Sequence, residues 1–127
     1  MIETIVNTLS ALVNNMHYLT AMLLFLIGFH TMLTHSNLIK KIIGMNIMET
    51  SVFLFFISIG YVHDASAPIL DDKVAIYVNP LPSALILTGI VVGVSLTAFA
   101  LAMVVMLYNH YGTICSDQIM RLREEER

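Results

Sequence analysis

The run from Ala84 to Leu107, ALILTGIVVGVSLTAFALAMVVML, contains no charged residue. A helix needs about 20 mainly apolar residues to cross about 30 Å of hydrocarbon, so this run is long enough to span a membrane. Hydrophobic residues make up 57% of the chain and charged residues 12%, whereas soluble domains are about 25% charged. We therefore predict an all-α integral membrane protein that forms one membrane domain over residues 1–127.

The other apolar stretches predict two more spans. We expect three transmembrane helices at about residues 9–34, 38–62 and 82–110, followed by a tail at 111–127. Upstream of Tyr18, apolar residues recur at helical spacing, which indicates either the outer end of a long tilted helix or a segment lying in the membrane interface. The sequence leaves both open. In the tail, Ser116-Asp117 is an N-cap signal and predicts a short helix.

The distribution of Lys and Arg predicts the orientation in the membrane, because cytoplasmic loops carry an excess of both. The first loop, THSNLIKK, has two, and the tail has three, namely Arg121, Arg123 and Arg127. The N-terminal segment has none and the second loop has only Lys73. We expect the N-terminus outside the cell and the C-terminus in the cytoplasm.

Several classes of site are not expected. The single Cys115 excludes a disulfide within the chain and an iron–sulfur cluster held by this chain alone. No two histidines have metal-ligand spacing within one helix, so we predict no metal site. The sequence shows no basic patch for nucleic acid and no nucleophile–base pair, so we expect neither nucleic-acid binding nor enzymatic activity from this chain alone. The histidines are His17, His30, His35, His63 and His110.

Glu49, in GMNIMETSV, lies inside the second predicted span. A charged side chain at a helix centre costs about 2.5–3.5 kcal/mol on insertion scales, so it tends to face protein or water with a partner. Asn46 lies three residues earlier and therefore shares its face. Glu49 is a candidate proton- or cation-handling acid, or a hydrogen-bonded acid that fixes helix packing; the residues alone favour neither.

His30 lies in the first span and is a further candidate for the proton path. A membrane histidine can relay protons because its pKa is near neutral, or it can stay neutral and hydrogen-bond a neighbouring helix, which is the interpretation we favour. In the third span, Gly89, Gly93 and Thr97 form a small-xxx-small pattern. Such residues let helix backbones approach closely, so they are predicted to pack against another helix of this chain or of a partner.

Two long segments identify a family. NLIKKIIGMNIMETSVFLFFISIGYV followed by APIL, and then NPLPSALILTGIVVGVSLTAFALAMVVMLY, resemble the C subunit of the multisubunit Mrp-type sodium/proton antiporters over about residues 36–112. That family is similar to the K subunit of respiratory complex I and to small subunits of membrane-bound energy-converting hydrogenases. The proline-started third span, from Pro80 to Val91, is the most specific part of the resemblance.

The resemblance implies a three-helix subunit without catalysis of its own, in the plasma membrane of a prokaryote. It would lie between large antiporter-like subunits and other small membrane subunits, in a complex that transports Na+ and H+. It would carry no iron–sulfur cluster, flavin or nickel. The complex would be a free-standing antiporter, or a hydrogenase or related ferredoxin-dependent complex with an Mrp-like module; the residues METSV…SIGYV…APIL favour the second.

The chain departs from the K subunit of complex I at two positions. That subunit carries one buried glutamate in each of its second and third helices, and matching the two patterns places Asn46 and Gly93 at these positions. Both departures speak against membership of complex I itself. Glu49 lies one turn from the first position and on the same face, so it could substitute for the missing acid.

Two other classes of function are compatible with the residues. A small homo-oligomeric transporter or channel would line its own pore with the Asn46 and Glu49 face, and would be stable when purified alone. An assembly or regulatory membrane protein would accompany a complex in substoichiometric amounts.

Overall fold

The computed structural model describes residues 1–62, 64–69 and 76–125. His63, Lys73 and Arg127, which entered the predictions above, lie outside this part. The described chain forms five helices: α1 (Ile2–Asn14), α2 (Met16–Thr34), α3 (Leu38–Gly60), α4 (Leu81–Tyr111) and α5 (Ser116–Glu125). Only two isolated β-bridges occur in the same residues. The all-α fold is therefore confirmed, as is the short helix predicted at Ser116-Asp117.

Three of these helices, α2, α3 and α4, are long and apolar enough to cross a membrane, which confirms the number of spans. At 1.5 Å per residue their 19, 23 and 31 residues correspond to about 28, 35 and 46 Å. The longest, α4, therefore exceeds the hydrocarbon thickness of about 30 Å and extends beyond it.

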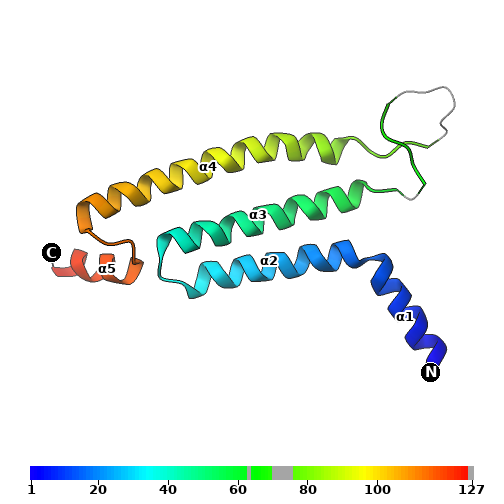
Figure 1. Cartoon of the computed structure of the whole chain (residues 1–127), viewed down its shortest axis with the longest axis horizontal. Coiled ribbons are helices and arrows are strands. Elements are labelled where there is room, and N and C mark those ends of the chain that lie inside the picture. Colours follow the sequence, from blue (N-terminus) through cyan, green and yellow to red (C-terminus); the bar gives the residue numbers. More distant parts are fainter. Residues whose placement is uncertain (63, 70–75, 126–127) are drawn as a thin grey trace.

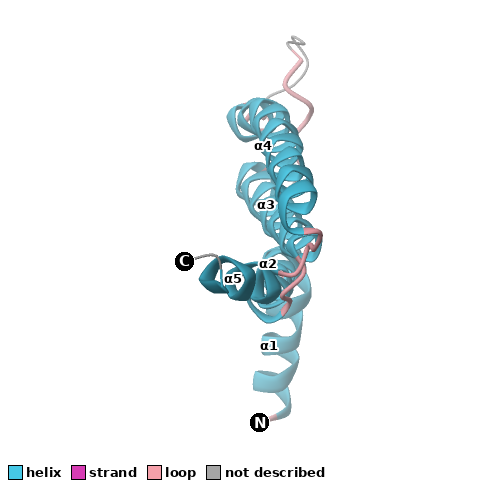
Figure 2. Ribbon diagram, turned by 90° about the vertical axis from the view of Figure 1, so that its left-hand side faces the viewer, coloured by secondary structure: helices cyan, strands magenta, loops and turns pink. Residues whose placement is uncertain are grey.

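These three helices lie side by side in one layer, with α3 in the middle (Figures 1 and 2). A single layer has little interior: the buried hydrophobic residues of the described chain are Ala21, Ile86 and Val104. Most of the large apolar side chains are exposed on the two faces of the layer. In a membrane these faces are covered by lipid or by other membrane proteins.

The contact between α2 and α3 is the more extensive of the two in the layer, and it is made by small residues. A Cβ atom added to Gly28 would lie 2.8 Å from the carbonyl oxygen of Gly44, and one added to Gly44 would lie 2.8 Å from that of Gly28. The two backbones thus touch at this point. Nearer the other end, the Tyr18 hydroxyl donates a 2.9 Å hydrogen bond to the Ser58 carbonyl.

Local signals fix the helix ends. The Asn37 side chain caps α3 by accepting hydrogen bonds from the backbone N–H groups of Ile39 and Lys40, as an N-cap asparagine does. At the start of α4, the Asn79 side chain accepts from Leu81 N. The helix ends at Tyr111, and the next residue, Gly112, has a φ of 69°, a left-handed conformation that glycine adopts without the steric cost of a Cβ.

After α4 the chain turns back to the α2–α3 connection. The Ser36 hydroxyl donates to the Asp117 carboxylate, and backbone hydrogen bonds join Leu38 N to Ile114 O at 3.0 Å and Ser116 N to Ser36 O at 2.8 Å. The start of α5 is therefore tied to the end of the layer where α2 and α3 meet (Figure 1).

The N-terminal part differs from the span expected at about 9–34. The helix is interrupted at Asn15, whose φ and ψ are −106° and 20°, and α1 turns away from the axis of α2 (Figure 1). The Asn15 side chain donates to the Ala11 carbonyl, which also accepts a hydrogen bond from the Asn15 backbone N–H. Asparagine is a weak helix former because its side chain can bond to nearby backbone groups in this way. The membrane-length helix accordingly begins at Met16, and α1 is a separate helix with an exposed apolar face.

Candidate functional site

Glu49 lies at the midpoint of α3, with eleven residues of the helix on either side. At 1.5 Å per residue it is about 16 Å from each helix end, so its carboxylate lies near the middle of the hydrocarbon when α3 spans a membrane. Glu49 is the only acidic residue in the three membrane-length helices α2, α3 and α4. It therefore lies at the depth where a charge is most costly.

The polar face of α3 meets the small-residue pattern of α4 in a regular antiparallel register. The Thr97 hydroxyl donates a 2.7 Å hydrogen bond to Asn46 Oδ1. One turn along, the Glu49 carboxylate lies against Gly93, and a further turn along the Phe53 ring lies against Gly89. The structure thus brings together five of the six residues singled out from the sequence: Asn46, Glu49, Gly89, Gly93 and Thr97.

A groove of about 540 Å³ follows this contact. Apart from the Asn46, Glu49, Thr50 and Thr97 side chains, its lining is apolar. Glu49 is half-buried in it. The residues that line the groove are Asn46, Glu49, Thr50, Phe53, Ile90, Gly93, Val94, Thr97, Ala98 and Leu101.

The Glu49 carboxylate forms no hydrogen bond or ion pair with the part of the chain that the structure describes. The nearest basic residues along the same helix, Lys40 and Lys41, are two turns or more away at its start. An acid in the hydrocarbon region needs a donor, a cation or a proton to offset its lost hydration. For Glu49 that group has to come from outside the described chain.

His30, the sixth candidate, is not part of this site. Its side chain is exposed on α2, and its ring nitrogens lie 3.4 and 3.5 Å from the Thr34 hydroxyl. It does not line the groove between α3 and α4.

The residues that join α2 to α3 were not predicted from the sequence. Buried small residues recur every seven positions on both helices, at Ala21 and Gly28 on α2 and at Gly44, Ser51 and Ser58 on α3. A seven-residue repeat keeps one narrow seam facing a neighbouring helix, so this spacing was the signal that could have found them. The four-residue spacing of a GxxxG pattern does not detect it.

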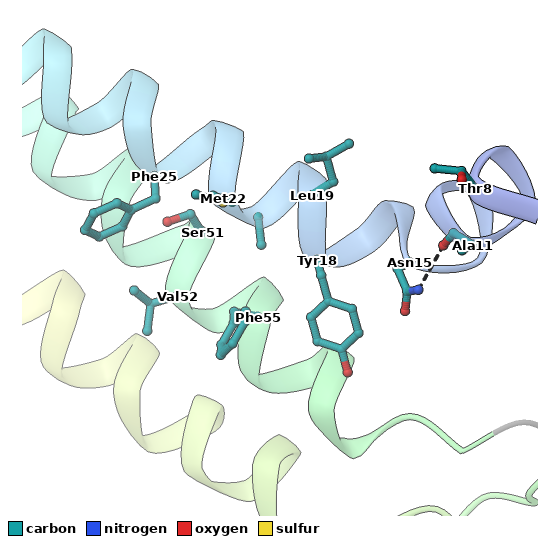
Figure 3. A pocket seen from close by; sticks show the side chains of 11 residues that line it. Thr8, Ala11, Asn15, Tyr18, Leu19, Met22, Phe25, Ser51, Val52 and Phe55 are labelled. Carbon is teal, nitrogen blue, oxygen red and sulfur yellow. Dashed lines mark hydrogen bonds between the residues drawn. The ribbon is translucent and has the colours of Figure 1, made fainter. Parts of the chain in front are cut away.

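A larger cavity of about 680 Å³ lies between the α1–α2 bend and α3 (Figure 3). Its lining includes the rings of Tyr18, Phe25 and Phe55 and contains no acid, basic residue or thiol. Because this lining holds no charged side chain and no group that gains or loses a proton near neutral pH, the smaller groove at Glu49 is the candidate site. No group of three or more His, Cys, Asp or Glu side chains suited to a metal ion occurs among residues 1–62, 64–69 and 76–125.

Comparison with known proteins shows that the chain is similar to antiporter subunits over most of its length. The chain is 35% identical over 109 residues to the C1 subunit of the Na+/H+ antiporter of Staphylococcus saprophyticus, covering 86% of this chain and 90% of that one. It is 33% identical over 96 residues to the C subunit of the Na+/H+ antiporter of Bacillus subtilis, covering 76% and 82%.

A solved structure is similar as well. A chain of the membrane-bound sulfane sulfur reductase, an archaeal respiratory membrane complex, is 48% identical, with a TM-score of 0.74 and coverage of 80% of this chain and 94% of that one. The profile of the family described as NADH-ubiquinone/plastoquinone oxidoreductase chain 4L matches residues 16–124. This protein belongs to the NADH-ubiquinone/plastoquinone oxidoreductase chain 4L family.

Proposed function

We propose that this protein is a non-catalytic membrane subunit of a redox-driven, ion-translocating complex, in which Glu49 provides one protonatable station of the ion path. Its relatives are subunits of sodium/proton antiporters and of a respiratory membrane complex. It is accordingly a multi-pass protein of the prokaryotic plasma membrane that assembles with other membrane subunits. Na+ and H+ are the ions that we propose for the complex.

The observation that carries this proposal is the Glu49 carboxylate at mid-membrane depth, to which no described residue donates a hydrogen bond or a charge, in a groove that opens on the outside of a single-layer chain. A purely structural acid would be expected to have its hydrogen-bonding partners within its own fold. An acid that reaches the edge of its subunit can exchange a proton or bind a cation with water or a neighbouring subunit. The Asn46–Thr97 hydrogen bond makes the adjacent lining polar.

The choice of a redox-driven complex over a free-standing antiporter rests on similarity. Identity to the sulfane sulfur reductase chain is 48%, against 35% and 33% for the two antiporter subunits. Together with the METSV…SIGYV…APIL residues, this difference supports an Mrp-like module within a respiratory complex.

Affinity purification tests the assembly. We expect the tagged chain, extracted from its native host in mild detergent, to retain stoichiometric antiporter-like subunits together with iron–sulfur or other redox subunits, identified by mass spectrometry. Antiporter subunits without redox subunits would replace the redox-driven complex by a free-standing antiporter. A discrete oligomer of this chain alone would contradict the proposal as a whole.

We also propose that α1 faces the outside and α5 the cytoplasm, because Lys40 and Lys41 at the start of α3 and the described arginines of α5 lie at one end of the layer. In a Cys115→Ser background, Thr4→Cys should react with a membrane-impermeant maleimide in intact cells. Glu125→Cys should react only in inverted vesicles. Both side chains are exposed, so accessibility within the fold does not bias the comparison, and the reverse pattern would invert the orientation.

A further inference from the structure

Gly93 meets α3 in a different way from the other glycines of the layer. A Cβ atom added to Gly93 would have as its three nearest neighbours the two oxygens and the carboxyl carbon of Glu49, all at overlapping distance. At Gly28 and Gly44 the neighbours include backbone atoms of the facing helix, and at Gly89 they are atoms of the Phe53 ring. The space left by the missing side chain of Gly93 is thus occupied by the carboxylate itself.

We infer that Gly93 is a positioning residue for Glu49, and that the absence of a side chain there lets the acid of α3 rest on the backbone of α4. This inference rests on the proposed role of Glu49 in ion translocation. The described chain gives the carboxylate no hydrogen bond or ion pair, so shape is what this chain contributes to its position. Gly93 is buried while Glu49 is half-buried, which leaves the carboxylate backed by α4 and open toward the groove.

The alternative is that Gly93 serves helix packing alone. A packing glycine is required because backbone meets backbone, and its replacement is felt whatever side chain lies opposite. The geometry at Gly93 predicts instead that the effect of a methyl group depends on the length of the acid at position 49. Aspartate is shorter than glutamate by one methylene, or about 1.5 Å along the side chain, so it withdraws the carboxyl group from the space that alanine would fill.

A cycle of variants tests this dependence in the assembled complex. Gly93→Ala, Glu49→Asp and the double variant are compared with wild type for two quantities, each normalised to assembled complex. One is the rate of ion translocation in inverted vesicles, and the other is the labelling of residue 49 by dicyclohexylcarbodiimide, measured by mass spectrometry. Gly89→Ala, alone and with Glu49→Asp, is the matched control, because its methyl group meets Phe53.

We expect Gly93→Ala to lower translocation by at least about tenfold, since a misplacement of about 1 Å can cost a hundredfold. The double variant, Gly93→Ala with Glu49→Asp, should translocate ions at least about threefold faster than Gly93→Ala alone. Its labelling at residue 49 should be close to that of Glu49→Asp alone. Adding Glu49→Asp to Gly89→Ala should give no recovery. If Gly93→Ala fails to assemble, recovery of assembly in the double variant supports the inference in the same way.

The inference would be overturned if the loss of rate in the double variant equalled the product of the losses in Gly93→Ala and Glu49→Asp. It would also be overturned if neither variant that carries Gly93→Ala assembled. Gly93 would then be a packing residue. Failure of the proposed function has a different signature. If Glu49→Gln translocates ions at the wild-type rate, the ion-path role is lost, but carbodiimide labelling does not require transport. If the effect of Gly93→Ala on the labelling of residue 49 depends on whether that residue is glutamate or aspartate, the labelling would then still show that Gly93 positions the acid.

Discussion

Replacing Gly28 by alanine is expected to separate α2 from α3 and to prevent most copies of this chain from being incorporated into the assembled complex. The added methyl group would lie 2.8 Å from both the Gly44 carbonyl oxygen and the Met48 backbone nitrogen. Overpacking costs about 1–3 kcal/mol where side chains can adjust, and here the obstructing atoms include backbone. Since 1.4 kcal/mol corresponds to a factor of ten, we expect at least about a tenfold loss of incorporation, measured as this chain per purified complex.

Gly89→Ala is the control for this loss, because it adds the same methyl group to a membrane helix of the same chain. Its nearest neighbours are atoms of the Phe53 side chain, which can rotate, so incorporation should stay within about twofold of wild type. Wild-type incorporation of Gly28→Ala would show that the α2–α3 contact does not require its two glycines.

The membrane helices could be predicted from sequence because each carries its own signal. The charge-free run within α4 and the apolar length of α3 need no partner to be recognised, and Asn37 and Gly112 mark helix ends by local chemistry. The break at Asn15 was harder to predict. Apolar residues keep helical spacing through it, and a single asparagine changes the helix direction without interrupting that pattern.

The candidate site was predictable as two separate sets of residues. Asn46 and Glu49 share a face by their spacing in one helix, and Gly89, Gly93 and Thr97 share a face of another. That Glu49 meets Gly93 depends on how far α3 and α4 slide past each other, which is fixed by contacts such as that of Gly60 with Pro82. No local signal encodes that register, and none shows that His30 lies outside the groove.

The register also bears on Gly93, one of the two departures from the complex I pattern. The resemblance places Gly93 where a third-helix acid is expected, and the structure places the Glu49 carboxylate against that glycine. The site therefore holds one acid at the contact of the two helices, supplied by α3. This supports the hypothesis that Glu49 substitutes for the missing acid.

Replacing Glu49 by glutamine is expected to stop ion translocation while leaving the complex assembled. Glutamine has nearly the same shape and still fits against Gly93, but it neither releases a proton nor carries the negative charge that holds a cation. Loss of a positioned proton-transfer group costs about a hundredfold or more in rate. Glu3→Gln, at an exposed site in the first turn of α1, and His30→Ala should both translocate ions within about twofold of wild type.

The most direct test of Glu49 as a station of the ion path is therefore the rate of ion translocation by Glu49→Gln and wild-type complexes in inverted vesicles. The rate is divided by the amount of fully assembled complex, and the vesicles are energised by the electron donor of the complex or by an imposed proton gradient. We expect normal assembly and a rate lowered about a hundredfold. A wild-type rate in a fully assembled complex would contradict the ion-path role and leave Glu49 as a structural residue.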